Sequence, residues 1–285
     1  MILVTGGTGT SGKPIVEALL ARAERVRVLA RDPEKAASLL GPDVEIVRGD
    51  LQDVQSIEAA MDGVERALLL TASAPNLLEL ETNFIKAAES ADVRHVVKFS
   101  VDLADPNASD MRFMRVHGQA ETALRHSALH WTMLQPTFFM QNILGYAGMA
   151  KSGALYLPTG AGRAPYVDTR DIAAVAAAAL TESGHEGRRY VITGPRSVSV
   201  ADIAATLSDV MDREVKHVDV PPDAAKQALL ATGMTEWYAD GVNELNAGLK
   251  AGEFDHVTDT VRTVGKKEPT TLEQFLREHA AVFKA

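Results

Sequence analysis

Short apolar runs alternate with amphipathic stretches along the first half of the chain. The apolar runs predict strands at residues 2–5, 25–30, 44–48, 66–71, 95–100 and 130–135. The stretches between them repeat apolar residues with a helical period, which predicts helices at about 11–23, 33–40, 55–61, 76–91 and 109–127. Because the alternation is regular and the connections are short, the pattern favours an α/β fold: a doubly wound parallel sheet with helices on both faces.

The pattern changes after Pro136. Glycine, proline and aromatic residues are frequent in 136–168, where the periodicity is weak. A helix at 169–182 and a strand at 189–193 follow, and further helices are predicted at 199–211, 222–232, 234–250 and 270–284. We therefore expect two units. Residues 1–135 with 169–194 form a dinucleotide-binding sheet domain, and 136–168 with 195–285 form a smaller, mostly helical C-terminal lobe that binds substrate.

The first predicted strand runs directly into a glycine-rich turn and then a helix. Gly6, Gly9 and Gly12 are evenly spaced, with Thr10 and Ser11 before the last glycine. Glycine adopts the backbone angles of such a turn without strain, and a helix start offers unpaired N–H groups and the positive end of the helix dipole. This order of elements is typical of the pyrophosphate site in a Rossmann-type dinucleotide-binding domain.

Arg31 ends the second predicted strand, where such a fold meets the adenosine ribose. A guanidinium there pairs with a 2′-phosphate, which favours NADP(H) as cofactor, with NAD(H) as the alternative. Asp32 follows, but Asp32 and Pro33 together indicate a helix start with the aspartate as its cap. The other interpretation of Arg31 is a solvated loop charge.

Composition narrows the function classes. The 285 residues carry a net charge of −9, which argues against nonspecific nucleic-acid binding. The absence of cysteine excludes disulfides and thiolate chemistry, and the eight histidines lack a ligand spacing that predicts a metal. No apolar run approaches the roughly 20 residues that span a bilayer, and the first strand leaves no room for a signal peptide. We expect a cytoplasmic enzyme without a membrane partner, a monomer or a homodimer.

Several motifs carry a family resemblance that extends over the whole chain. They stand at residues 5–12, 31–33, 48–51, 135–142, 166–173 and 218–222. On these motifs the chain resembles the NmrA-like branch of the atypical short-chain dehydrogenases/reductases, and within it the NADPH-dependent quinone reductases and triphenylmethane reductases. The branch also contains dinucleotide-sensing regulators without turnover. A non-catalytic NADP(H)-sensing regulatory protein is therefore the alternative function.

The resemblance implies a set of cofactor contacts at the ends of the predicted strands. The implied contacts to the phosphates are Gly6, Gly9, Thr10, Ser11 and Gly12, and the contact to the 2′-phosphate is Arg31. The implied contacts to the adenine are Asp50 and Leu51, and those to the nicotinamide ribose are Thr71 and Ser100. The implied contacts to the nicotinamide ring are Pro136, Thr137 and Phe138. Two alternatives stay open. Asp50 can instead cap a helix, and Thr71 and Ser100 can form ordinary strand-end hydrogen bonds.

The tyrosine–lysine pair with which the parent superfamily reduces carbonyls is missing. None of the five tyrosines is followed four positions later by lysine. The corresponding helix carries His117 and Glu121 on one face, and Gly118 between them would let a ligand approach the backbone. Reduction of a simple ketone needs a positioned proton donor, whereas quinones, iminium ions and cationic dyes accept hydride readily. His117 and Ser100 are the catalytic candidates. The alternative is a histidine hydrogen-bonded to Glu121 without a chemical role.

Aromatic and amide side chains beyond the nicotinamide-facing turn are expected to hold the substrate. They are Phe139, Gln141, Asn142, Tyr166 and Trp237. Such a wall suits a small, flat or aromatic electrophile. Asp168 and Asp171 are expected to cap the helix that begins near 169. The sequence thus predicts an NADPH-dependent oxidoreductase that transfers hydride to a quinone, dye, imine or activated carbonyl.

Overall fold

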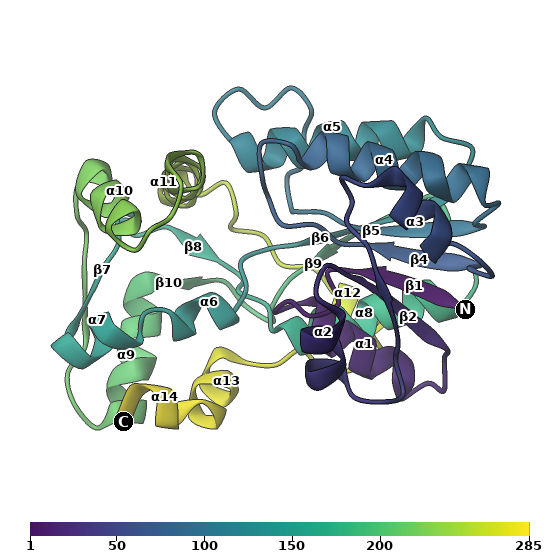
Figure 1. Ribbon diagram of the computed structural model, residues 1–285. Coiled ribbons are helices and arrows are strands. Elements are labelled where there is room, and N and C mark those ends of the chain that lie inside the picture. Colours follow the sequence, from purple (N-terminus) through teal and green to yellow (C-terminus); the bar gives the residue numbers. More distant parts are fainter. Residues whose placement is uncertain (285) are drawn as a thin grey trace.

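Seven parallel strands form one sheet in the computed structural model, which describes residues 1–284 (Figure 1). In spatial order they are β3 (Glu45–Arg48), β2 (Val26–Ala30), β1 (Ile2–Thr5), β4 (Arg66–Leu69), β5 (His95–Phe99), β6 (His130–Pro136) and β9 (Arg188–Ile192). The direction in which strands are added reverses between β1 and β4, which pair directly. This is the predicted Rossmann-type sheet, and the connections diverge at the reversal to leave a crevice at the carboxyl ends of the strands.

Two helical layers cover the sheet (Figure 1). One layer contains α1 (Gly12–Leu20), α2 (Pro33–Leu40), α8 (Thr169–Thr181) and α12 (Thr260–Thr263). The other contains α3 (Val54–Ala60), α4 (Leu77–Ser90) and α5 (Arg112–Arg125). A sheet covered on both faces has continuous apolar strands, and every residue of β1 and β5 is buried. Polar side chains of the sheet therefore meet solvent or ligands at the strand ends and along the edge strands β3 and β9.

The smaller lobe has a hydrophobic core of its own. Its helices are α6 (Gln141–Leu144), α7 (Ala147–Ser152), α9 (Val200–Met211), α10 (Pro222–Ala231), α11 (Glu236–Ala251), α13 (Leu272–Glu278) and α14 (Ala280–Lys284). Two small sheets, which the sequence did not predict, pair β7 (Ala154–Tyr156) with β11 (Lys216–Val218) and β8 (Arg163–Ala164) with β10 (Val198–Ser199). Strands this short carry no readable periodicity. The single helix predicted at 270–284 is wrong, because the chain breaks at His279 between α13 and α14.

One stretch of the C-terminal segment returns to the sheet domain. Val261 of α12 lies in the core beneath α1 and α8, and the hydroxyl of Thr258 donates to the carbonyl of Val191 in β9 at 2.7 Å. The proposed division into two units therefore needs one adjustment, since residues around α12 pack with the sheet domain. Among residues 1–284, no helix combines the length and the apolar character needed to cross a bilayer.

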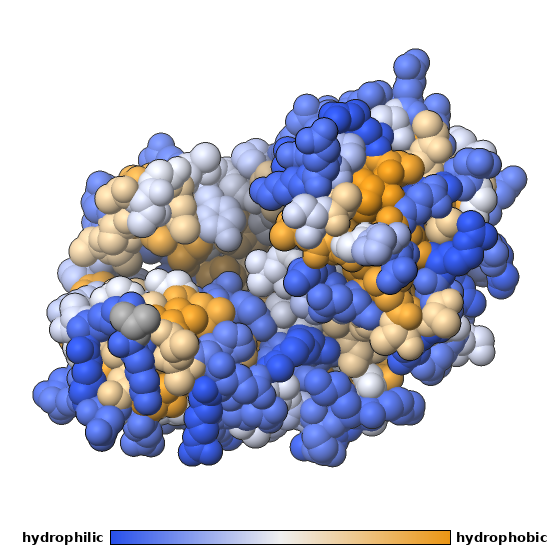
Figure 2. Space-filling view, turned by 60° about the horizontal axis from the view of Figure 1, so that its bottom comes forward, coloured by the Kyte–Doolittle hydropathy of each residue, from blue (hydrophilic) through white to orange (hydrophobic). Residues whose placement is uncertain are grey.

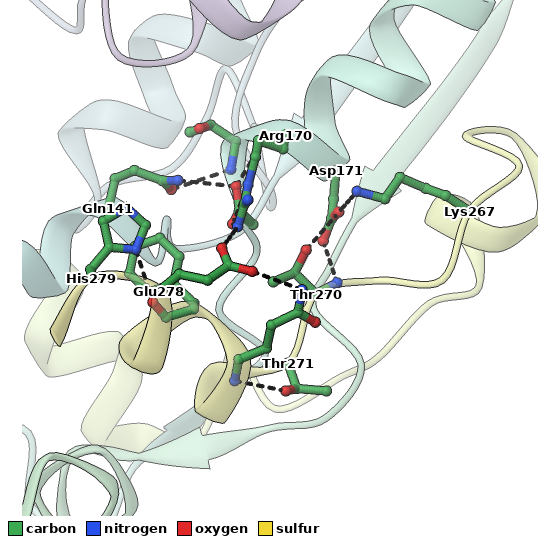
Figure 3. A network of polar contacts seen from close by, with 12 residues as sticks. Gln141, Arg170, Asp171, Lys267, Thr270, Thr271, Glu278 and His279 are labelled. Atoms are coloured by element: carbon green, nitrogen blue, oxygen red, sulfur yellow. Dashed lines mark hydrogen bonds and ion pairs between the residues drawn. The ribbon is translucent and has the colours of Figure 1, made fainter. Parts of the chain in front are cut away.

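A polar network at the start of α8 ties the C-terminal segment to the sheet domain (Figure 3). Asp168 caps α8 as predicted, accepting a hydrogen bond from the backbone of Arg170. Asp171 does not cap the helix. Its fully buried carboxylate accepts from the backbone N–H of Thr270 at 2.7 Å and from the Thr270 hydroxyl at 3.1 Å, and it pairs with Lys267 Nζ at 2.6 Å. Arg170 bridges Asp168 to Glu278 of α13.

We expect Asp171→Ala to destabilise the protein by about 1.5–3 kcal/mol, the usual contribution of hydrogen bonds to a charged group. The measurement is the free energy of unfolding in a denaturant titration. Asp259→Ala is the matched control, because that carboxylate is 77 % exposed and pairs only with Arg262 within α12 and its cap. The control should stay within about 0.5 kcal/mol of the wild type. Equal effects of the two substitutions would contradict this role of Asp171.

Candidate functional site

A cavity of about 620 Å³ lies at the carboxyl ends of β1, β4, β5 and β6, between the sheet domain and the smaller lobe. Figure 2 shows the surface hollowed between the two units, with apolar residues in its depth. The lining runs from the glycine turn, through the strand ends, to the aromatic residues of the lobe. Of the residues predicted from the sequence, it includes Gly6, Gly9, Thr10, Ser11, Arg31, Thr71, Ser100, His117, Pro136, Thr137, Phe138, Phe139 and Asn142.

The glycine turn has the geometry of an anion cradle. Gly6 has a positive φ of 64°, and a Cβ there would collide with Leu70. A Cβ on Gly12 would collide with the carbonyl of Gly6, so Gly12 lets the turn fold back against α1. Gly9 faces the cavity, and a Cβ there would approach only the Gly6 carbonyl, at 3.3 Å. Ser11 begins α1 without using its hydroxyl as a cap, so the first N–H groups and this hydroxyl suit a phosphate.

Arg31 lies at the tip of β2, on the cavity wall. Asp32 caps α2 as predicted, accepting from the backbone N–H of Lys35 at 3.1 Å. The Asp32 carboxylate is thus engaged in a hydrogen bond to the start of α2. Within residues 1–284 the Arg31 guanidinium has no ion-pair partner. An exposed, unpaired guanidinium beside the anion cradle suits a second phosphate group.

Ser100 supplies the polar atom that most directly indicates a ligand. Its side chain is fully buried and lines the cavity, yet its hydroxyl has no hydrogen-bond partner within the described part of the chain. A buried hydroxyl without a partner is costly, so a ligand with polar atoms is expected to complete it. Thr71, at the end of β4, differs because its hydroxyl donates to the carboxylate of Glu81. The cradle, Arg31 and Ser100 together fit a dinucleotide that carries a 2′-phosphate.

His117 lies in a buried polar network rather than in a pair with Glu121. Its Nδ1 is 3.4 Å from Lys98 Nζ, and its Nε2 is 3.1 Å from the hydroxyl of Ser73. Burial and the charge of Lys98 lower the pKa of His117 well below its usual 6.5, so the imidazole is neutral near pH 7. The predicted contact with Glu121 is wrong. That carboxylate instead accepts from Gln135 Nε2 at 2.8 Å, because side chains four apart on one face can still diverge.

Gly118 has a packing role, not the predicted role of admitting a ligand. A Cβ there would collide with the backbone of Asp105 and Pro106. The close approach to α5 is therefore made by the loop after β5 and not by a bound molecule.

Aromatic rings from the sheet domain and from the smaller lobe line the cavity. Phe99 and Phe139 meet edge to face at 6.1 Å between centroids, and Phe138 meets Phe254 in the same way at 5.0 Å. Phe254 comes from the segment after α11, where His256 Nε2 lies 2.9 Å from the carboxylate of Asp102 in the loop after β5. Edge-to-face rings leave flat apolar surfaces that suit a planar ligand.

Some predicted cofactor residues lie outside the cavity lining. Asp50 accepts a hydrogen bond from the backbone N–H of Gln52, whereas Asp53 caps α3. The alternative interpretation of Asp50 as a helix cap is therefore wrong. Leu51 is partly buried and its carbonyl accepts from Asn83. Adenine contacts at Asp50 and Leu51 therefore stay predictions.

Three residues that were predicted to contact substrate instead make hydrogen bonds or packing contacts within the protein. Gln141 donates to Asp168 and accepts from the backbone of Thr169. Tyr166 is buried against Phe138, 5.5 Å between ring centroids. Trp237 packs on Phe113 beside the cavity, and its neighbour Tyr238 occupies the lining instead. Substrate contacts by these three residues stay predictions.

Sequence reasoning missed several residues at the site. They include Ser73, Glu81, Lys98, Asp102, Phe113, Leu245 and Phe254. A signal existed for two of them. Lys98 interrupts an otherwise apolar strand, and Glu81 falls in the buried stripe of α4 with Leu77 and Phe84. For Phe254 no local pattern existed, because the segment after α11 reaches the site only through tertiary packing.

Comparison with known proteins assigns the fold and site to a family. The NmrA-like family matches residues 1–276. An NAD(P)H azoreductase of Xenophilus azovorans is 38 % identical over 286 residues, covering all of both chains. The structure of the quinone oxidoreductase QOR2 of Escherichia coli with NADPH aligns with a TM-score of 0.90 and 25 % identity, covering 98 % of this chain and 99 % of that one. The Citrobacter triphenylmethane reductase with NADP(H) gives 0.88 and 26 %, covering 98 % and 100 %.

The chain belongs to the NmrA-like family. The match extends over the sheet domain and nearly all of the smaller lobe, so it includes both sides of the cavity. The family resemblance inferred from the sequence motifs is thereby confirmed.

We expect Gly9→Val to abolish dinucleotide binding while the protein stays folded. The substituted side chain would fill the cradle, but the backbone at Gly9 has an ordinary φ and few neighbours. The measurement is NADPH binding by calorimetry, with circular dichroism to check folding. Gly148→Val, at a glycine with open space around it, is the control and should bind normally. Unchanged binding by folded Gly9→Val would refute the cradle.

Proposed function

We propose that this protein is an NADPH-dependent reductase of flat, electrophilic acceptors such as quinones and azo or triarylmethane dyes. The observation that carries the proposal is one continuous cavity, which joins a phosphate cradle to an aromatic wall and contains a neutral histidine in place of a tyrosine–lysine pair. The NAD(P)H azoreductase that this chain matches over its whole length supports a reductase over a non-catalytic regulator.

The residues that would hold the cofactor follow from the lining. The glycine turn and Ser11 take the pyrophosphate, and Arg31 takes the 2′-phosphate. Ser100 and the 136–138 turn lie where the strands end next to the acceptor side of the cavity. When bound there, NADPH supplies the hydride.

The acceptor side works by positioning more than by acid catalysis. Phe138, Phe139 and Phe254 offer ring faces and edges to a planar molecule and exclude water from it. His117, neutral at pH 7, provides a weak hydrogen-bond donor rather than a strong acid. Acceptors that already attract hydride are reduced under these conditions, whereas a simple ketone lacks the proton donor it needs.

The direct test is the loss of NADPH absorbance with a panel of acceptors. A quinone, an azo dye and a triarylmethane dye should be reduced much faster than a simple aldehyde. If no acceptor of the panel is reduced while NADPH binds tightly, the sensing function replaces the enzymatic one.

Arg31→Ala should weaken NADPH binding about ten- to a hundredfold and leave NADH binding nearly unchanged. A charge-assisted hydrogen bond to the 2′-phosphate contributes roughly 1.5–3 kcal/mol. Calorimetric titration of both cofactors measures the change. Arg25→Ala removes the same charge at the opposite end of β2 and should bind both cofactors like the wild type. A wild type that binds NADPH and NADH equally would contradict this role.

His117→Ala should lower kcat for a quinone by at most about tenfold, well short of the 10²–10⁴ of a true general acid. Because the pKa of folded His117 lies well below 6.5, the imidazole stays neutral as the pH falls from 8 through 6.5. The kcat profile should therefore show no step near pH 6.5. His126→Ala, at the exposed far end of α5, is the control. A thousandfold loss together with a step near pH 6.5 would identify His117 as the proton donor.

A further inference from the structure

Lys98 is a lysine without contact to water. It stands on β5 in the middle of the sheet, and its side chain is fully buried. Charged side chains are almost never buried to this extent unless they are paired. The residues around its ammonium therefore determine what this side chain does.

Three acceptors surround the ammonium. Glu81 of α4, also fully buried, places Oε2 at 2.6 Å from Nζ. The carbonyl of Phe99 lies at 3.5 Å and Nδ1 of His117 at 3.4 Å. The second carboxylate oxygen of Glu81 accepts from the hydroxyl of Thr71. Within residues 1–284, Glu81 Oε2 has no partner besides the ammonium of Lys98, and that ammonium also lies within hydrogen-bond distance of the imidazole.

This contact determines the tautomer of His117. An ammonium can only donate hydrogen bonds, so the nitrogen that faces it must carry the lone pair. Nδ1 is therefore unprotonated, and in the neutral ring the proton is on Nε2. Nε2 faces the hydroxyl of Ser73 at 3.1 Å, and both side chains line the cavity.

We propose that Lys98, held by Glu81, is a positioning residue that fixes His117 as the neutral tautomer with its Nε2–H directed at the hydroxyl of Ser73 on the cavity wall. The tautomer of His117 does not depend on the proposed reductase function, whereas the expected effect on kcat rests on it. A buried ion pair is often no more stabilising than apolar residues of the same volume, so the fold alone does not require Glu81 and Lys98. The Ser73 hydroxyl that accepts from this N–H can in turn donate to the negative charge that hydride addition places on a quinone oxygen.

The test is nitrogen NMR of the protein with labelled histidine and without cofactor, which reports the tautomer directly. The His117 signals are assigned by their absence in His117→Ala. In the wild type, Nδ1 should be unprotonated and Nε2 protonated throughout pH 6.5 to 8. A protonated Nδ1 in the wild type would overturn the proposal, whatever the protein reduces.

The decisive variant removes both charges. Lys98→Met alone leaves a buried carboxylate without its ion partner, which is strongly destabilising, so we pair it with Glu81→Gln. In this double variant His117 should lose its single tautomer, and its pKa should rise because the Lys98 charge that lowers it is gone. Glu121→Gln, a buried carboxylate of α5 that contacts Gln135 instead, should leave the tautomer unchanged. An unchanged tautomer in a folded double variant would overturn the proposal.

Kinetics separate positioning from an independent role. The double variant should lower kcat for a quinone by the same factor as His117→Ala, at most about tenfold, with KM for NADPH unchanged. Combining the double variant with His117→Ala should cause no further loss, since residues that act through one another are not additive. Additive losses would show that Lys98 does not act through His117. A wild type with the expected tautomer and no reductase activity would refute the proposed function alone.

Discussion

The structure depends on a parallel sheet that is covered on both faces. With α1 and α8 on one side and α4 and α5 on the other, strands β1 and β5 are fully buried, and polar residues of the sheet meet water at the strand ends and on the edge strands β3 and β9. The reversal of strand order between β1 and β4 opens those ends into a crevice. The glycine turn, Arg31, Ser100 and the 136–138 turn are brought together there because each follows a strand. The smaller lobe then adds Phe138 and Phe254 to the aromatic rings that Phe99 and Phe139 contribute from the sheet side.

One exception to the apolar interior is the Glu81–Lys98 pair. It lies directly beneath the cavity and extends through His117 and Ser73 to its surface. The same pair that compensates a buried charge also holds the histidine neutral. A neutral histidine in an apolar cavity accounts for chemistry without the tyrosine–lysine pair of the parent superfamily. The acceptor must then bring its own electrophilicity, which agrees with dye and quinone reductases among the similar proteins.

Much of the sheet domain could be predicted from the sequence, because each strand and helix carries a local pattern. Asp32 and Pro33 indicated the start of α2, and the glycine spacing indicated the cradle. The lobe was harder to predict, because its strands are short and α12 packs away from its neighbours in sequence. Side-chain partners were harder still. The helical spacing of His117 and Glu121 implied a contact, but Lys98 and Ser73 are the actual partners, and only the packing of α5 on the sheet reveals them.

We propose that this cavity carries out direct hydride transfer from NADPH to a flat acceptor without a titrating histidine. The most direct measurement is single-turnover reduction of a quinone by NADPH deuterated at the transferred position, followed from pH 5 to 8. Direct hydride transfer without a titrating histidine predicts a primary isotope effect at every pH. It also predicts a rate without a step near pH 6.5, the usual histidine pKa. Failure to oxidise bound NADPH, or a rate that follows the titration of a histidine, would contradict it.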